Sequence, residues 1–465
     1  MAPTRLRRAR WLALMLSSMV LTSGLSDHAH PALALPQPVA QAATASAQEL
    51  VDLRSHIKHV VVMIQENHTF GNVLGDGCAR TSRCRGLRIG SKVRLSNGAV
   101  VTLKGATDKV PETDHSFASQ QAAWNGGRND AWQRIGGCGG PNYGCMSSYA
   151  PEQIPALWSL ATHFALSDNT YTCNPVSSWG DHFSWQTACN LDGFAGSIPL
   201  KTSGAGPTWG CRSKRVEPWS ATGRPPYRLE PACNPDPSLT APNGGAFRPT
   251  PVRSIRTLGE NCDRASSCTR ASYNTALIWS TDESHAYLAY HHNIRRSTTQ
   301  FLADAQSGQL PGLSILTPAM PGGETSQHNG ASMAVGDRGI RTALSAVMNG
   351  PQWNSTAVFI TYDDCGCFYD SVAPNRVPLV IVSPWAKPGY VDSTRVTFAG
   401  VQAFIENVFG LPRLNGADAS AYTFGKAFTF SQAALHPIAL PLARIPTSSR
   451  VLARATYRAD PDDPS

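Results

Sequence analysis

Four short apolar runs along the sequence constrain the fold more than any other feature. They are rich in Val, Ile and Leu and cover residues 60–64, 313–316, 357–362 and 377–382. Runs of this kind are typical of strands that are covered on both faces. Helical patterns lie between them, for instance over residues 339–348 and 401–409. Strands that alternate with helices predict an α/β fold with a mostly parallel central sheet and helices on both faces.

Acidic and amide side chains follow two of these runs directly. Glu66-Asn67 comes after the first run, and Asp363-Asp364 after the third. The carboxyl ends of strands are where open α/β sheets bind ligands. Adjacent carboxylates repel each other unless a positive charge lies between them, and oxygen-rich sites favour Ca, Mg or Mn. The pattern therefore indicates one divalent ion; the alternative is that Asp363-Asp364 simply opens a turn.

The start of the chain has the pattern of an export signal. The first ten residues contain four arginines, and residues 11–25 are largely apolar. We therefore expect a signal peptide over residues 1–34, a linker over 35–55 and a secreted or periplasmic protein. Arg7-Arg8 loosely resembles a twin-arginine signal, so both export routes stay open.

Charge and hydropathy exclude some classes of partner. The net charge of +8 suits anionic substrates or surfaces. No basic tract interleaved with aromatic residues is present, so we expect no nucleic-acid partner. No stretch after the signal approaches the ~18 apolar residues of a membrane span, so we expect no span in the mature protein.

The twelve cysteines predict a disulfide framework, because an even count in an exported protein is typical of one. A zinc cluster is disfavoured, since no C-x-x-C doublet occurs. From about residue 195 to 260 the chain is rich in Gly, Pro, Ser and Arg, which predicts an irregular, disulfide-stapled insertion. Connectivity stays open, but three close pairs are expected to staple surface loops: Cys78/Cys84, Cys138/Cys145 and Cys262/Cys268.

Several motifs occur in a fixed order between about residues 57 and 435. They are the segment 59–70 with Glu66-Asn67, then Asp114-His115-Ser116, Ser178-Trp-Gly-Asp-His182, His328-Asn-Gly330 and Tyr362-Asp-Asp-Cys-Gly-Cys-Phe-Tyr-Asp370. In this order they resemble the bacterial phosphoesterase family that contains phosphatidylcholine-hydrolysing phospholipases C and certain acid phosphatases. The resemblance implies an alkaline-phosphatase-like catalytic domain over 56–435, followed by a tail over 436–465.

The same resemblance implies a metal-dependent phosphoric ester hydrolase, of phospholipase C or acid phosphatase type, with a serine nucleophile. Ser178 matches the family pattern Ser/Thr-x-Pro-Asn-Arg/His and would form a phosphoseryl intermediate, with Ser177 as the alternative. Either serine would also cap the helix expected to begin near Trp179. One histidine would protonate the leaving group and another would bind phosphoryl oxygen; the candidates are His115, His328, His291 and His292. The metal ligands implied are Glu66, Asn67, Ser178, Asp363 and Asp364.

Departures from the family pattern leave other functions open. The family's Asp-His is Asp370-Ser371 here, and its Gly-Gly is Gly366-Cys367. Cys365 and Cys367 flank the metal motif, and we expect each to staple a neighbouring loop. The departures motivate an exported binding protein on an inactive phosphoesterase scaffold. A serine carboxylesterase is a second alternative, although no Gly-x-Ser-x-Gly elbow occurs.

The substrate class also stays open at this point. We expect no counterpart of the extra carboxy-terminal β domains that the family's longer phospholipases C carry, so a phospholipid headgroup is one candidate partner among several phosphate esters.

Overall fold

The structure is a computed structural model. All the residues it describes belong to the unit that spans residues 37–465. They are residues 46–111, 113–173, 178–189, 199–201, 207–209, 257–273, 295–317 and 325–447.

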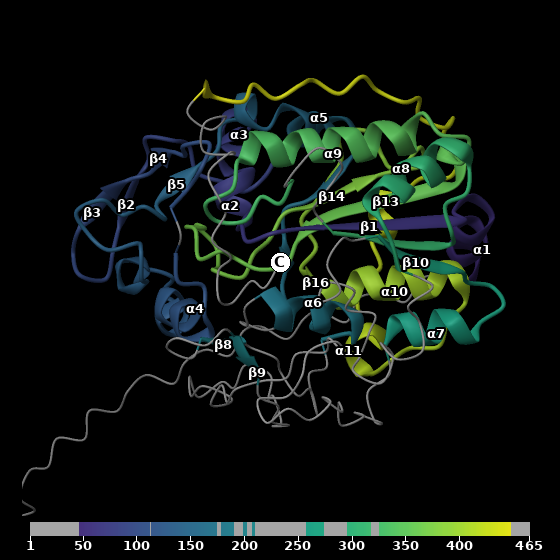
Figure 1. The fold of residues 1–465 in the computed structure, drawn as a ribbon, viewed down its shortest axis with the longest axis horizontal. Coiled ribbons are helices and arrows are strands. Elements are labelled where there is room, and N and C mark those ends of the chain that lie inside the picture. Colours follow the sequence, from purple (N-terminus) through teal and green to yellow (C-terminus); the bar gives the residue numbers. More distant parts are fainter. Residues whose placement is uncertain are drawn as a thin grey trace, which may run out of the picture. The chain divides into compact units, whose positions relative to one another are not determined.

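An eight-stranded sheet forms the centre of the described part (Figure 1). Its strand order is β11-β10-β12-β1-β13-β14-β6-β15. Neighbours pair in parallel except at β14, which runs antiparallel to both β13 and β6. The strands are β1 His59–Gln65, β6 Ala165–Ser167, β10 Arg270–Tyr273, β11 Arg295–Arg296, β12 Leu313–Leu316, β13 Thr356–Tyr362, β14 Leu379–Val382 and β15 Val391–Asp392.

The four apolar runs form β1, β12, β13 and β14, so the prediction of a mostly parallel α/β sheet is confirmed. Every residue of β13 is buried, and so is every residue of β1 except the first. Such complete burial requires helices on both faces of the sheet.

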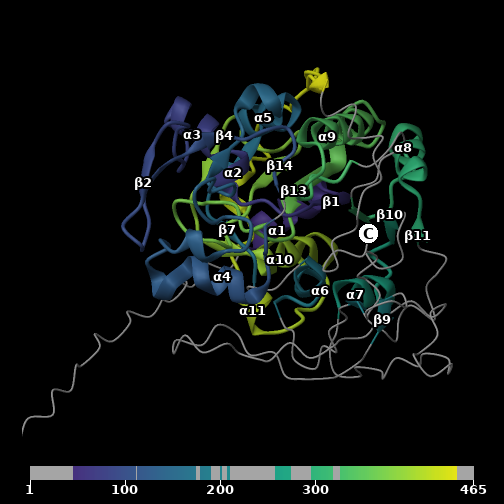
Figure 2. The ribbon, with the colours of Figure 1, turned by 60° about the vertical axis from the view of Figure 1, so that its left-hand side comes forward.

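Helices cover the sheet as expected. In Figures 1 and 2, α5, α8 and α9 lie over one face, and α6 and α10 lie over the other. Helix α9 begins at a serine cap, with Ser332 Oγ accepting from the Val335 N–H, and buries its apolar stripe. The helices are α1 Ala47–His56, α2 Phe70–Val73, α3 Gly75–Thr81, α4 Phe117–Trp124, α5 Pro155–His163, α6 Ser178–Gln186, α7 Leu258–Arg264, α8 Thr298–Ser307, α9 Met333–Met348, α10 Phe398–Phe409 and α11 Gly416–Ala419. None of these described helices is long and apolar enough to cross a membrane.

Smaller pairs of strands flank the main sheet. Strands β2 and β3 form an antiparallel hairpin, whereas β4 pairs with β5, and β7 with β16, in parallel. The pairs are β2 Lys92–Arg94 with β3 Val100–Thr102, β4 Lys104–Gly105 with β5 Ser147–Ser148, β7 Thr170–Tyr171 with β16 Val396–Thr397, and β8 Pro199–Lys201 with β9 Pro207–Trp209. Most of the insertion expected over residues 195–260 lies outside the described residues.

Residues 47–55 of the expected linker segment lie, together with His56, in α1. Ser46 and Glu49 make a capping box at the start of this helix, and Leu53 packs into the core. The local capping pattern therefore nucleates a helix in a segment of modest apolar content.

The disulfides expected between close cysteines are present. Cys78–Cys84, Cys138–Cys145 and Cys262–Cys268 are all bonded. A fourth disulfide joins Cys173, before α6, to Cys189, after the end of this helix. Each bond closes a short loop and so limits the freedom of the unfolded chain.

Asp337 on α9 is hydrogen-bonded to the start of the neighbouring helix α5. Its two carboxylate oxygens accept from the backbone N–H groups of Ala156 and Leu157, at 3.0 and 2.9 Å, in the first turn of α5. Burial raises the pKa of this carboxyl to about 7, although the two N–H groups act in the opposite direction. Asp337 is thus a buried acid that titrates near neutral pH.

We predict that Asp337 makes folding stability pH-dependent. Because its folded pKa lies above the ordinary value, its contribution is complete below about pH 4 and is lost as the pH rises through about 7. Between pH 4 and pH 8, the wild type should therefore lose on the order of 2–4 kcal/mol of unfolding free energy relative to Asp337→Asn. Urea unfolding of both proteins across this range measures the shift. A constant difference would show that the carboxyl of Asp337 has the same pKa in the folded and unfolded states.

Candidate active site

Two strand ends form the base of the candidate site. Strands β1 and β13 pair in parallel, with their last residues opposite each other. The Asp363 N–H donates to the Gln65 carbonyl at 3.0 Å, and the Asn67 N–H donates to Asp363 Oδ1 at 2.8 Å. The register thus brings Glu66 and Asn67 beside Asp363 and Asp364.

The first residue of α6 closes the site from one side. Ser178 Oγ lies 2.9 Å from Asn67 Oδ1 and 3.2 Å from Asp364 Oδ2, and its single hydrogen can be donated to either acceptor. The side chain is fully buried. A hydroxyl at a helix N-terminus faces unpaired N–H groups and the positive end of the helix dipole, which favour negative charge there.

His182 reaches the same place from one turn further along α6. Its Nε2 lies 3.2 Å from Glu66 Oε1 and 3.7 Å from Asp363 Oδ2. One ligand atom from each of these three side chains lies within 4.8 Å of the others, and all three are buried. This group can hold a metal ion. His182 was not among the residues predicted for the site, although its spacing of four residues from Ser178 puts both on one helix face.

Carboxyl groups crowd this buried volume. Glu66, Asp181, Asp363 and Asp364 are each at most 3% exposed. Burial, and then the neighbouring Asp363, raise the pKa of Asp364 to about 8. Burial, and then Asp364 and Asp363, raise the pKa of Asp181 well above its usual value. Because like charges are held together away from water, a bound cation would lower the free energy of the ionised cluster.

Among the described residues, the hydrogen-bonding needs of the Asn67 amide are met when its nitrogen, and not its oxygen, faces Ser178 and Asp364. With its oxygen toward Ser178 it joins the cluster of oxygen atoms, as a metal ligand would. With the amide reversed, its nitrogen donates to Asp364 Oδ1 at 2.8 Å, and its oxygen accepts from His328 Nε2 at 2.6 Å. The donor set of carboxylates, amide, hydroxyl and imidazole therefore fits a divalent cation in the first orientation and is internally bonded in the second.

Two of the predicted histidines lie at the site. The rings of His115 and His328 are 5.9 Å apart, edge to face. Nδ1 of His115 bonds the Thr113 carbonyl at 3.0 Å, and Nδ1 of His328 bonds the Asn329 carbonyl at 2.9 Å. A carbonyl only accepts, so both Nδ1 atoms carry hydrogen and Nε2 is the atom that can exchange a proton.

The other predicted residues are not all placed. His291, His292 and Ser177 lie outside the described residues. Ser371, which stands where the family has histidine, is exposed to solvent.

The prediction that Cys365 and Cys367 each staple a neighbouring loop is wrong. They are free, buried thiols whose sulfur atoms lie 3.2 Å apart. The turn between them is tight, with φ of +47° at Gly366 and +51° at Cys367. Its Gly366 N–H donates to Asp364 Oδ1 at 2.7 Å. The motif is thus a turn that orients Asp364.

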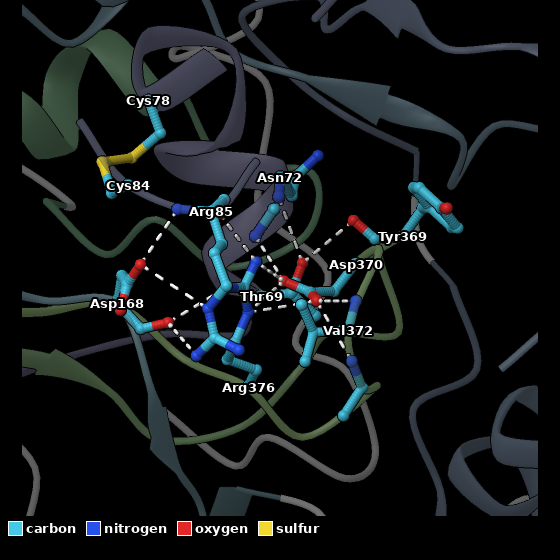
Figure 3. A network of polar contacts seen from close by, with 12 residues as sticks. Thr69, Asn72, Cys78, Cys84, Arg85, Asp168, Tyr369, Asp370, Val372 and Arg376 are labelled. Atoms are coloured by element: carbon cyan, nitrogen blue, oxygen red, sulfur yellow. Dashed lines mark hydrogen bonds and ion pairs between the residues drawn. A yellow bond between two sulfur atoms is a disulfide. The ribbon is translucent and has the colours of Figure 1, made fainter. Parts of the chain in front are cut away.

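Asp370 belongs to a structural network rather than to the carboxylate cluster (Figure 3). It forms a fully buried ion pair with Arg376, with Nη2 and Oδ2 2.9 Å apart, and it accepts from the Gly71 N–H at 2.7 Å. Arg376 also donates to the Asp168 carbonyl at 3.0 Å and lies over the Phe70 ring. The network fixes α2, which directly follows the Glu66-Asn67 turn.

We predict that the turn next to Asp364 tolerates no side chain at Gly366. A Cβ there would lie 1.9 Å from the Asn67 carbonyl oxygen, in addition to requiring a positive φ. Gly366→Ala should therefore cost more than the ~1–2 kcal/mol of an alanine at positive φ alone. Gly98 also has positive φ but has no atom within 4 Å of its Cβ position, so Gly98→Ala is the matched control. Equal losses of unfolding free energy in the two variants would contradict the close approach.

Comparison with known proteins gives consistent matches. Non-hemolytic phospholipase C of Burkholderia pseudomallei is 25% identical over 413 residues, covering 76% of this chain and 55% of the relative. Phospholipase C A of Mycobacterium tuberculosis is 25% identical over 355 residues, covering 69% and 60%. Non-specific phospholipase C6 of Arabidopsis thaliana is 29% identical over 178 residues, covering 30% and 34%. The chain spans less than two thirds of the length of each relative.

A solved structure of a protein in the alkaline phosphatase superfamily, from Vibrio parahaemolyticus, is also similar. It is 10% identical with a TM-score of 0.36, and the match covers 80% of this chain and 77% of the other. The model of the Phosphoesterase family matches residues 57–412, most of the chain. This protein belongs to the Phosphoesterase family.

Proposed function

We propose that this protein is a phosphoric ester hydrolase, of phospholipase C or acid phosphatase type, that uses Ser178 as its nucleophile. The observation that carries the proposal is the contact of Ser178 Oγ with Asn67 and Asp364, at the strand ends where the carboxylates gather. Membership of the Phosphoesterase family and the named phospholipase C relatives support the same chemistry.

Asp364 is suited to take the proton of Ser178. Its Oδ2 lies 3.2 Å from Ser178 Oγ and can accept the hydroxyl hydrogen, which is the geometry that a general base requires. The Ser178 oxygen then attacks phosphorus, forming a phosphoseryl bond as the bond to the ester oxygen breaks. Water cleaves the phosphoseryl bond in a second step and regenerates the serine.

His115 and His328 serve the leaving group and the phosphoryl oxygens. Their Nδ1 hydrogens are held by backbone carbonyls, so Nε2 is directed to proton transfer or hydrogen bonding. One of the two protonates the departing ester oxygen, and the other binds a phosphoryl oxygen. His291 and His292 remain candidates for a supporting part on the sequence resemblance.

The proposal includes one divalent ion. The residues that would hold it are the predicted Glu66, Asn67, Ser178, Asp363 and Asp364, together with His182, which lies beside Glu66 and Asp363. When bound, the ion supplies positive charge that offsets the carboxylates and the phosphoryl oxygens. The imidazole favours a transition ion such as Mn over Ca or Mg, which prefer oxygen ligands alone.

The alternatives receive less support from these contacts. A serine carboxylesterase needs a histidine base on its nucleophile, but the Ser178 hydroxyl bonds an amide and a carboxylate. An inactive binding scaffold was motivated by Ser371 and Cys367. Neither departure removes a member of the carboxylate cluster, because Ser371 is exposed and Cys367 belongs to the supporting turn.

Substrate class and location form the last part of the proposal. The relatives are named phospholipases C, so a phosphodiester with a phospholipid headgroup is the first substrate to test, followed by phosphomonoesters. Four disulfides among the described cysteines support a secreted or periplasmic protein.

We predict that Ser178→Ala abolishes hydrolysis of both p-nitrophenyl phosphate and p-nitrophenyl phosphorylcholine. The loss of the nucleophile should lower turnover by about 10³-fold or more, with the protein still folded. Ser314→Ala is the control, since it removes a buried strand hydroxyl that has no hydrogen-bond partner among the described residues. A folded Ser178→Ala protein with wild-type turnover would rule out the serine mechanism. A wild-type preference for p-nitrophenyl phosphorylcholine would indicate a phosphodiesterase, and a preference for p-nitrophenyl phosphate would indicate a phosphomonoesterase.

A further inference from the structure

The thiols of Cys365 and Cys367 are a separate feature of the site that the proposed reaction does not use. Both are fully buried, and they are the free cysteines of the described part of the chain. The other eight described cysteines form four disulfides. A protein that otherwise oxidises its described cysteines thus keeps a thiol pair directly beside its most crowded carboxylates.

We propose that Cys365 and Cys367 form a reversible disulfide upon reaction with a peroxide, and that this bond lowers the activity of the adjoining site. The effect on activity rests on the proposed function, whereas formation of the bond does not. Cys367 stands where the family pattern has its second glycine, so the device would belong to this chain's own sequence.

The distance between the thiols permits the bond. Their sulfur atoms are 3.2 Å apart, and the Cys367 N–H donates to Cys365 Sγ at 2.9 Å. A disulfide needs about 2.05 Å, so the sulfur atoms must approach by about another ångström.

The oxidation balances with peroxide as the oxidant. One sulfur attacks the O–O bond and takes up a hydroxyl group to become a sulfenic acid, and the first water leaves. The second sulfur then attacks the first, forming the S–S bond and releasing the sulfenic oxygen as a second water. The two thiols together lose two electrons and two protons, and the peroxide is reduced to two water molecules.

Gly366 couples the bond to the site. Its N–H donates to Asp364 Oδ1 at 2.7 Å, and its carbonyl accepts from Thr113 Oγ1 and, at 3.4 Å, from Asn329 Nδ2. Its Cα is pressed so closely against the Asn67 carbonyl that a Cβ would lie 1.9 Å from that oxygen. Drawing the two sulfur atoms together must therefore move Gly366 relative to Asp364 and Asn67. Both of these residues contact the Ser178 hydroxyl.

The test compares reduced protein with protein treated with hydrogen peroxide, using peptide mapping and turnover. Trypsin should release residues 342–376 as one peptide that holds both thiols and no other cysteine. In the reduced protein this peptide takes up two alkyl groups. In the treated protein it should take up none and be lighter by two hydrogens. Turnover should fall about 10- to 100-fold, as when a hydrogen bond supporting a ligand is lost, and should recover with dithiothreitol.

The Cys365→Ser/Cys367→Ser variant is the matched control, because hydroxyls replace thiols at similar volume. Its turnover should be unaffected by peroxide under the same conditions. Absence of the bridge in the treated wild-type peptide would overturn the proposal. A bridge without change in turnover, or equal inhibition of the double variant, would also overturn it.

A second readout separates this proposal from the proposed function. If reduced protein hydrolyses neither phosphate ester, calorimetric titration with Mn²⁺ compares the reduced and bridged forms. Weaker Mn²⁺ binding by the bridged form supports coupling through Gly366, and identical titrations contradict it.

Discussion

The parallel pairing of β1 with β13 is the constraint on which the rest of this site depends. Its register places two acidic strand ends at one edge of the sheet, where backbone hydrogen bonds lock them together. Both strands are buried by helices on both faces, so the carboxylates cannot move apart toward water. Helix α6 then adds Ser178 and His182 to the same volume. The fold therefore gathers carboxylates whose ionised forms have a high free energy alone. A bound cation would lower that free energy.

The buried aspartates near the site have two different kinds of surroundings. Asp370 has a full set of partners, including a buried arginine and backbone N–H groups, which is what a structural carboxylate requires. Asp363 and Asp364 lie next to other carboxylates, and burial raises the pKa of Asp364. This contrast distinguishes a network that holds the Glu66-Asn67 turn from a cluster available for chemistry.

The sequence predicted the parts of this structure that depend on local pattern. Apolar runs marked the core strands, and the acidic residues after two of them marked the edge where Glu66 and Asp363 meet. His182 was missed because its role depends on the direction in which α6 approaches the sheet, which no local pattern specifies. The prediction for Cys365 and Cys367 was wrong because disulfide pairing depends on distances between distant segments. Helix α1 was missed because a capping box outweighs modest apolar content there.

The most direct test of the account is the position of a bound ion. Crystals of the protein grown with Mn²⁺ should show an anomalous scattering peak between the two strand ends. We expect this peak about 2.0–2.4 Å from carboxylate oxygens of Glu66 and Asp363, the range of metal–oxygen distances in proteins. The same peak should lie within coordination distance of His182. An ion bound elsewhere at full occupancy, with the carboxylate cluster empty, would contradict the central claim.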